Sequence, residues 1–306
     1  MKSNRNEHEP SIKLFEGERG LVITGLIGFI LSIGIALFIY FKGHINLPEG
    51  DMKDALSFNA ALGIFALSIA AILPLARFGE RKRKVVRWFF ILASLYSYTV
   101  ETVQNFRGIN PRFTREGTSI DMVAGMLFGV VSLVLVALAV MLTIHFLRMK
   151  SPHERPLLIL GIRYAFLSVI LANIAGIWMI LLQGRFTGDA GNLIVLHGIG
   201  FHALQILILP AWFLEKTPVK DRFKKRLLHS GSIAWMLMIL LIGIQTGLGR
   251  SAFELTILPI LGSCLLFVCF GTVIITFVLF IKQRRDDSLP IVQLSFKEKR
   301  DKNIYH

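Results

Sequence analysis

Long hydrophobic runs alternate with short polar segments along the whole chain. Crossing the roughly 30 Å hydrocarbon layer of a bilayer takes about 20 helical residues. Each run should be a helix, because lipid offers no hydrogen-bond partner to polar backbone groups. Eight runs reach the required length: 20–41, 55–76, 86–106, 120–147, 157–183, 192–214, 229–248 and 255–281. The pattern predicts an all-α, polytopic helical membrane bundle with about eight transmembrane helices.

The distribution of Lys and Arg predicts how these helices are oriented. Of the 34 Lys and Arg residues, 26 lie in the two tails and in the segments after the second, fourth and sixth runs, and seven lie in the other connecting segments. Basic loops are retained on the cytoplasmic side of a membrane. We therefore expect residues 1–19 to form a cytoplasmic tail, 20–281 the eight-span domain, and 282–306 a basic cytoplasmic C-terminal tail.

The composition agrees with a protein that is surrounded by lipid. Hydrophobic residues make up 54% of the 306 residues and charged residues only 18%, with a mean hydropathy of +0.61. A soluble domain has about a quarter charged residues. The net charge of +14 could indicate nucleic acid, but the basic residues form short clusters between apolar runs, as in loops that face an anionic leaflet. The expected partner is thus the lipid bilayer and not nucleic acid, and nothing indicates an oligomeric state.

Two of the predicted spans contain costly polar residues. Glu101 and Asn105 share one face of the run 86–106, Gln104 lies beside them, and Arg107 follows at the outer exit. The run 192–214 contains His197 in its outer half, with His202 and Gln205 nearer its middle. An ionisable side chain inside a bilayer costs a few kcal/mol and normally faces a partner or a wet cavity.

These polar residues allow a structural and a functional interpretation. In the structural one, Glu101 pairs with Arg107 or His197, and the amides hold neighbouring helices together. In the functional one, a pocket open to the outer side binds a small or lipid-like ligand. The predicted ligand-binding residues are Glu101, Gln104, Asn105, Arg107, His197, His202 and Gln205.

Two other functions remain open from the sequence. The chain could be a membrane redox protein in which His202 or His197 binds a b-type haem or a quinone, or a non-catalytic sensor or assembly partner. Enzymatic activity is less favoured, because no Ser/His/Asp order, phosphate-binding loop or metal-ligand set is present. Cys264 and Cys269 lie inside the last run and are expected to be small buried hydrophobic residues.

The first and second halves of the chain share their hydropathy but no corresponding motif, so the sequence does not indicate an inverted-repeat transporter and leaves a hidden repeat open. The first run lacks the short core and the cleavage site of a secretory signal, and it is expected to remain as the first span.

Two short segments carry a family resemblance. The first is ETVQNFRGINPRF, from Glu101 to Phe113, and the second is HGIGFHALQ, from His197 to Gln205. The pair resembles a signature of uncharacterised bacterial multi-pass membrane proteins, in which a Gln-x-x-Arg-Gly segment after one span accompanies a His-Ala-Leu-Gln segment in a later one. The resemblance implies a bacterial plasma membrane location and no particular activity.

Two better-known families fit less well. Haem A synthase also has eight spans, but its paired glutamate–histidine motifs are absent. Membrane hydrolases of the ceramidase and adiponectin-receptor type require three histidines around zinc, and His197 and His202 point about 140° apart on a helix.

Overall fold

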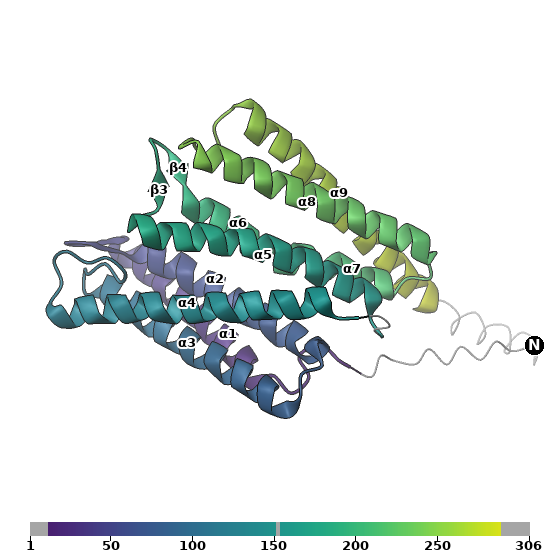
Figure 1. The fold of residues 1–306 in the computed structure, drawn as a ribbon, viewed down its shortest axis with the longest axis horizontal. Helices are drawn as coiled ribbons and strands as arrows, with labels where there is room; N and C mark the ends of the chain where they lie inside the picture. The colour runs from purple at the N-terminus through teal and green to yellow at the C-terminus, as the bar shows by residue number, and fades with distance from the viewer. Residues whose placement is uncertain (1–11, 151–153, 289–306) are drawn as a thin grey trace, which may run out of the picture.

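The predicted helical membrane bundle is confirmed by the computed structural model, which describes residues 12–150 and 154–288 (Figure 1). The helices are α1 (Arg19–Lys42), α2 (Met52–Ile72) with the 3₁₀ turn η1 (Leu73–Ala76), α3 (Glu80–Phe106), α4 (Ser119–Arg148), α5 (Pro156–Leu182), α6 (Leu193–Ile206), α7 (Ile208–Glu215), α8 (Asp221–Gly247) and α9 (Ile257–Ser288). All eight hydrophobic runs are helical. Most of both predicted tails, 1–11 and 289–306, lies outside the described residues.

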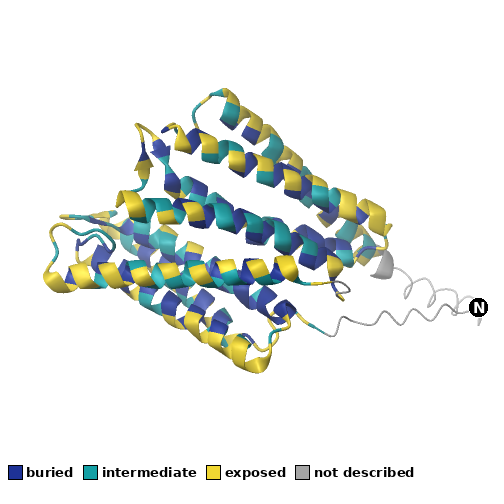
Figure 2. Ribbon diagram, viewed as in Figure 1, coloured by how far each residue is buried: buried dark blue, intermediate teal, exposed yellow. Residues whose placement is uncertain are grey.

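Seven stretches in the described part of the chain are long and apolar enough to cross a membrane: α1, α2 with η1, α4, α5, α6 with α7, α8 and α9. Helix α3 has a similar length, 27 residues, but it begins with the basic segment ERKRK and is therefore less apolar. The outer helices expose large hydrophobic side chains, such as Ile33 on α1 and Phe267 on α9. Figure 2 shows exposed residues along the outward faces of the helices, as expected for a protein surrounded by lipid.

The chain folds as two halves with the same order of elements, α1–α4 and α5–α9, which is the hidden repeat that the sequence left open. In each half the first helix leads into a hairpin whose two strands have two residues each. The first hairpin pairs β1 (Ile45–Asn46) with β2 (Gly50–Asp51), and the second pairs β3 (Phe186–Thr187) with β4 (Gly191–Asn192). The third long helices, α3 and α8, have the same length of 27 residues. Because each half contains four long helical segments, both halves run in the same direction, as in transporters with parallel repeats.

Equivalent hydrogen bonds confirm this repeat. The amide of Glu49 donates to the carbonyl of Gly108 at 2.8 Å, and the amide of Ala190 donates to the carbonyl of Gly249 at 2.9 Å. Along the sequence, Glu49 and Ala190 are separated by the same number of residues as Gly108 and Gly249. Both glycines have a left-handed backbone, with φ of 74° and 76°, which favours a residue without Cβ.

The hairpins of both halves approach the end of the third long helix in the same way. A Cβ on Gly50 would lie 2.5 Å from the carbonyl oxygen of Asn105, and a Cβ on Gly191 would lie 2.6 Å from that of Thr246. Only glycine allows this close packing of backbone against backbone. The hairpin and the helix end therefore form one tight unit in each half.

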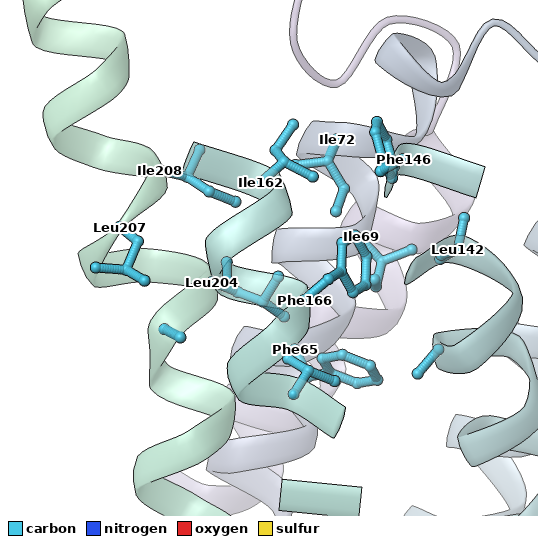
Figure 3. Close-up of a cluster of buried hydrophobic side chains, with 14 of the residues drawn as sticks. Phe65, Ile69, Ile72, Leu142, Phe146, Ile162, Phe166, Leu204, Leu207 and Ile208 are labelled. Carbon is cyan, nitrogen blue, oxygen red and sulfur yellow. The ribbon is translucent and has the colours of Figure 1, made fainter. Parts of the chain in front are cut away.

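The main hydrophobic core lies between the two halves (Figure 3). Phe146 of α4 stacks on Phe166 of α5 with ring centroids 5.6 Å apart. Other core side chains come from α2, α4, α5, α6 and α7: Phe65, Ile69, Ile72, Leu142, Ile162, Leu204, Leu207 and Ile208. These side chains extend from the middle of the spans, at Phe65 and Leu204, to the α4–α5 connection, which is the predicted cytoplasmic end. Large apolar side chains therefore fill the contact between the halves at this end, where packing rather than water exclusion stabilises a membrane bundle.

Candidate functional site

Glu101 lies fully buried at the outer end of α3 and forms an ion pair with Arg112. The Arg112 Nη2 group donates to Glu101 Oε2 at 2.8 Å, and Asn105 Nδ2 lies 3.4 Å from Glu101 Oε1. The guanidinium carbon of Arg112 lies 5.4 Å from the ring centre of Phe58 and 5.6 Å from that of Phe128. The guanidinium thus lies beside a pair of aromatic rings, Phe58 of α2 and Phe128 of α4, whose own centres are 5.7 Å apart.

The expected pairing of Glu101 with Arg107 or His197 is wrong, because Arg107 binds Asp121 instead. Arg107 Nη1 lies 2.6 Å from Asp121 Oδ1 and 2.9 Å from Gln104 Oε1. Gln104 Nε2 donates to the same carboxylate at 2.9 Å. The predicted site residues on α3 and at its end therefore divide into two groups, Glu101 with Asn105 and Gln104 with Arg107. The left-handed turn at Gly108 causes this division, since the chain after it returns toward Glu101.

Glu49 of the first hairpin fixes the loop that carries Arg112. Its carboxylate accepts hydrogen bonds from Thr114 Oγ1 at 2.5 Å and from the amides of Arg115 at 2.8 Å and Asn110 at 3.2 Å. Burial works to raise the pKa of Glu49, but these hydrogen bonds outweigh it and hold the pKa below its ordinary value. The loop and the hairpin are therefore joined on both sides of Arg112.

His197 of α6 lies on the other side of the contact between the halves. Its Nδ1 atom is 2.8 Å from the carbonyl oxygen of Ala172, and its ring packs edge-on against Phe201 at 4.9 Å. The charge of Arg112 is one of the electrostatic influences on His197. Among the described residues no hydrogen bond joins His197 to Glu101, so Arg112 is the charged group that acts on both of them.

His202 and Gln205 lie apart from Glu101. His202 is exposed, and its Nδ1 atom is 3.3 Å from Gln205 Oε1. Gln205 Nε2 donates to Ser68 Oγ of α2 at 2.5 Å and so joins the two halves. The structure thus brings together part of the predicted set, and a ligand role for these two residues stays a prediction.

A second ion pair crosses from one half to the other at the outer end. Arg185, between α5 and β3, places Nη1 3.0 Å and 3.1 Å from the two carboxylate oxygens of Asp54 in the first turn of α2. Asp54 also acts electrostatically on Glu101. Sequence reasoning missed this ion pair, because a carboxylate in the first turn of a helix is a common capping feature. We call Asp54, Glu101, Arg112, Arg185 and His197 the outer ionic cluster.

Polar side chains continue from Glu101 toward the middle of the bundle. The hydroxyl groups of Ser94, Ser97 and Tyr98 are buried without a hydrogen-bond partner in the described part of the protein, and so is Oδ1 of Asn59. Ser94 and Ser97 lie seven and four residues before Glu101, on the same face of α3. Each such group costs about 1–3 kcal/mol when it stays unpaired, which is unusual for a face that only packs.

The second half provides an internal comparison for this site. Helices α3 and α8 correspond residue by residue, and Ile242 occupies the position of Glu101. Gln245, the counterpart of Gln104, is also buried, and it donates to the carbonyl oxygen of Ser251 at 3.2 Å. The amide is therefore part of the repeated fold, whereas the buried carboxylate is not. An alignment of the first half of the sequence with the second would have revealed both the repeated glutamine and the carboxylate that only the first half has.

The described residues contain no group of three His, Cys, Asp or Glu side chains that could hold a metal ion. The hypothesis that His202 or His197 ligates haem stays a prediction. Of the cysteines, Cys269 is buried as expected, while Cys264 is exposed on α9.

No family model, curated protein or solved structure matches the chain. The resemblance of the Gln-x-x-Arg-Gly and His-Ala-Leu-Gln segments to a bacterial membrane family stays a prediction. The function of this multi-pass membrane protein must therefore be argued from the outer ionic cluster and its place between the halves.

Proposed function

We propose that this protein lies in the cell membrane with both termini in the cytoplasm, binds a small or lipid-like ligand at the outer ionic cluster, and transports it by movement of one half against the other. One observation carries the proposal: the buried carboxylate of Glu101 stands where the other half has Ile242 on an equivalent backbone.

This difference separates function from stability. Taking two charges out of water costs several kcal/mol per ion, and replacing a buried ion pair by apolar residues is often neutral or stabilising. The second half forms the same helix and the same hairpin contact without a carboxylate at this position. Stability therefore gives no reason for Glu101, whereas a ligand site does.

The position of the cluster supports a site that opens outward. Toward the predicted cytoplasmic end, large apolar side chains fill the contact between the halves. Toward the outer end, the exposed positions of the central helix α2 are small or polar: Lys53, Ser57 and Ala61. No large hydrophobic side chain of α2 is exposed, in contrast to the lipid-facing helices. Small and polar exposed residues are suited to water rather than to lipid.

The parallel repeat supports transport rather than binding alone. Transporters with two repeats hold their ligand at the contact between the repeats and expose it to each side by rigid movement of one repeat against the other. Here the contact is apolar at one end and ionic at the other. Opening the apolar end while the ionic end closes would move a bound ligand across the membrane.

Thiol labelling tests the proposed site. In a background with Cys264→Ala and Cys269→Ala, a single cysteine is placed at Ala61 of α2 or at Ile33 of α1. Both positions lie nine residues from the outer end of their helix, so they have similar depth, and Ile33 is 63% exposed. We expect a membrane-impermeant thiol reagent added to intact cells to label Ala61→Cys at least about tenfold faster than Ile33→Cys, because lipid suppresses thiolate formation.

The comparison decides between a water-accessible site and a sealed bundle. Equal and slow labelling of the two variants would overturn the proposal, provided that a third cysteine in the exposed hairpin at Leu47 reacts rapidly in the same cells. Fast labelling of Ala61→Cys only after permeabilisation would show that the site opens to the opposite side.

A further inference from the structure

We propose that the ligand is an organic carboxylate with an apolar body, and that Arg112 binds its carboxylate group. This inference rests on the proposed function, since it assigns a substrate class to the same site. It depends on the hydrogen bonds that Arg112 forms, on the rings around it, and on the charges near it.

Arg112 has unused hydrogen-bonding capacity. Its guanidinium donates to Glu101 through Nη2, and within the described part of the chain Nε and Nη1 have no acceptor. The side chain is 29% exposed, whereas Glu101 is fully buried behind it. A guanidinium presents its donors in a planar fork that fits a carboxylate in bidentate fashion. The free edge of Arg112 is therefore able to bind a second carboxylate while the other edge keeps Glu101.

The surroundings of Arg112 are aromatic rather than polar. The rings of Phe58 and Phe128 lie side by side next to the guanidinium. Further along the contact, Phe201 packs edge-on against both His197 and Phe65 at 4.9 Å. A cation this close to ring centres is attracted to the ring faces, which favours this position of the guanidinium. A ligand whose carboxylate lies on Arg112 would place its remaining atoms against these rings, so an apolar body is favoured over a second charged group.

The local charges link carboxylate binding to proton uptake. Glu101 is acted on by Arg112 from the α3–α4 loop and by Asp54 from α2, while Asn105 of its own helix donates to it. Helices α1 and α4 bring no charged side chain within hydrogen-bond distance of Glu101 in the described residues. A further anion beside two carboxylates is unfavourable unless one of them is neutralised. We therefore expect that one proton binds to Glu101 whenever one ligand carboxylate binds to Arg112.

Arg107 provides a matched control on the same segment. It also pairs with a buried carboxylate, but both of its terminal nitrogens are occupied: Nη1 lies 2.6 Å from Asp121 Oδ1, and Nη2 lies 3.4 Å from Oδ2. Gln104 accepts a further bond from Nη1. Replacing Arg107 removes a charge of the same sign at the same end of the protein without touching the free edge of Arg112.

The experiment measures the thermal stability of the full-length protein in detergent with added benzoate, dodecanoate, benzyl alcohol, benzylamine or inorganic phosphate at constant ionic strength. We expect benzoate or dodecanoate to raise the midpoint saturably by a few degrees, and more strongly at about pH 6 than at about pH 8. A benzoate effect indicates a soluble carboxylate, and an effect of dodecanoate alone indicates a lipid-derived one. Arg112→Gln should remove the shift, Arg112→Lys should reduce it, and Arg107→Gln should retain it.

Failure of this inference differs from failure of the proposed function. The inference would be overturned if benzyl alcohol, benzylamine or phosphate shifted the midpoint and the carboxylates did not. It would also be overturned if no compound shifted the midpoint. In both cases, fast labelling of Ala61→Cys would still support a water-accessible site. Slow labelling of Ala61→Cys would instead remove the site itself. Should Arg112→Gln fail to fold, Arg112→Lys decides, since an undiminished shift in that variant contradicts the bidentate role.

Discussion

Glu49 connects the first hairpin to the site, because its hydrogen bonds reach both sides of Arg112 along the chain. Asn110 lies before Arg112, and Thr114 and Arg115 lie after it. A charged acceptor forms stronger hydrogen bonds than a neutral one, typically about 1.5–3 kcal/mol each. Loss of this charge should loosen the loop and with it the position of Arg112.

This role predicts a pH dependence. The pKa of Glu49 is lowered in the folded protein, so the ionised form stabilises the fold above the ordinary pKa of a glutamate, and this contribution is lost as pH falls through the lowered value. We expect Glu49→Gln to reduce the free energy of unfolding at neutral pH by about 1 kcal/mol, a reduced figure because the side chain is partly exposed. Below about pH 4 the difference should shrink toward zero, as measured by thermal unfolding of the two proteins across pH.

The matched control for this prediction is Glu116→Gln, since Glu116 lies in the same loop but is exposed. That variant should follow the wild type at each pH. A stability difference between Glu49→Gln and the wild type that persists unchanged into acid would contradict the assigned cause.

For Glu101, the structural interpretation of the sequence predicted a buried, paired carboxylate but named the wrong partner. Arg107 and Arg112 are both near in sequence, and the choice between them depends on the backbone at Gly108 and on the bonds from Glu49. Helical periodicity describes neither, since both lie outside the helix. A buried acid in a span is readable from sequence, whereas the direction of the loop that neutralises it is not.

Between elements, the ion pair of Asp54 and Arg185 holds the outer ends of α2 and α5 together across the two halves. Both side chains are over a third exposed, so the pair contributes about 1 kcal/mol or less to stability. The pair is expected to control how easily water and ligand reach the outer ionic cluster. The inner ends of the halves are joined by a packed core, whereas this pair joins the outer ends.

Breaking the pair should therefore make the site more accessible without unfolding the protein. We expect Asp54→Asn to raise the labelling rate of Ala61→Cys about twofold to fivefold in intact cells, a range that corresponds to the loss of up to about 1 kcal/mol of outer contact. The exchanged pair Asp54→Arg with Arg185→Asp should return the rate toward that of the Ala61→Cys protein. An unchanged rate in both variants would mean that the pair does not control access.

The helices themselves could be predicted from the lengths of the hydrophobic runs, and the structure confirms all eight. The hairpins could not, because strands of two residues are too short for an alternating pattern. The division of the sixth run into α6 and α7 has a local cause. Pro210 has no amide hydrogen to donate to the carbonyl of Ile206, and α6 ends at that residue.

Over the whole molecule, the repeat was missed because lipid imposes the same apolar composition on both halves. Sequence similarity then survives only at the positions that the fold restricts, such as Gly50 with Gly191, Gly108 with Gly249, and the basic starts of α3 and α8. These positions are few and widely spaced. The asymmetric part, around Glu101, is the part that the proposed function requires, and it weakens the similarity further.

The repeat also makes the topology testable in both halves at once. The basic segments that begin α3 and α8 lie at one end of the bundle, and the two hairpins lie at the other. Because basic segments are retained in the cytoplasm, single cysteines at Leu47 and Asp189 should react with an impermeant reagent in intact cells. Cysteines at Arg81 and Arg222 should react only after permeabilisation. All four positions are exposed, so access to the reagent depends on the side of the membrane.

The two halves must give the same answer if they are parallel. If the cysteines at Arg81 and Arg222 reacted in intact cells and those at Leu47 and Asp189 only after permeabilisation, the orientation would be inverted. The outer ionic cluster would then face the cytoplasm, and the fold would be unchanged. Disagreement between Arg81 and Arg222 would be more serious, because two halves with four long helical segments each cannot face opposite sides. That result would exclude α3 as a membrane-crossing helix, and the buried Glu101 would then require a different explanation from the one given by a bilayer.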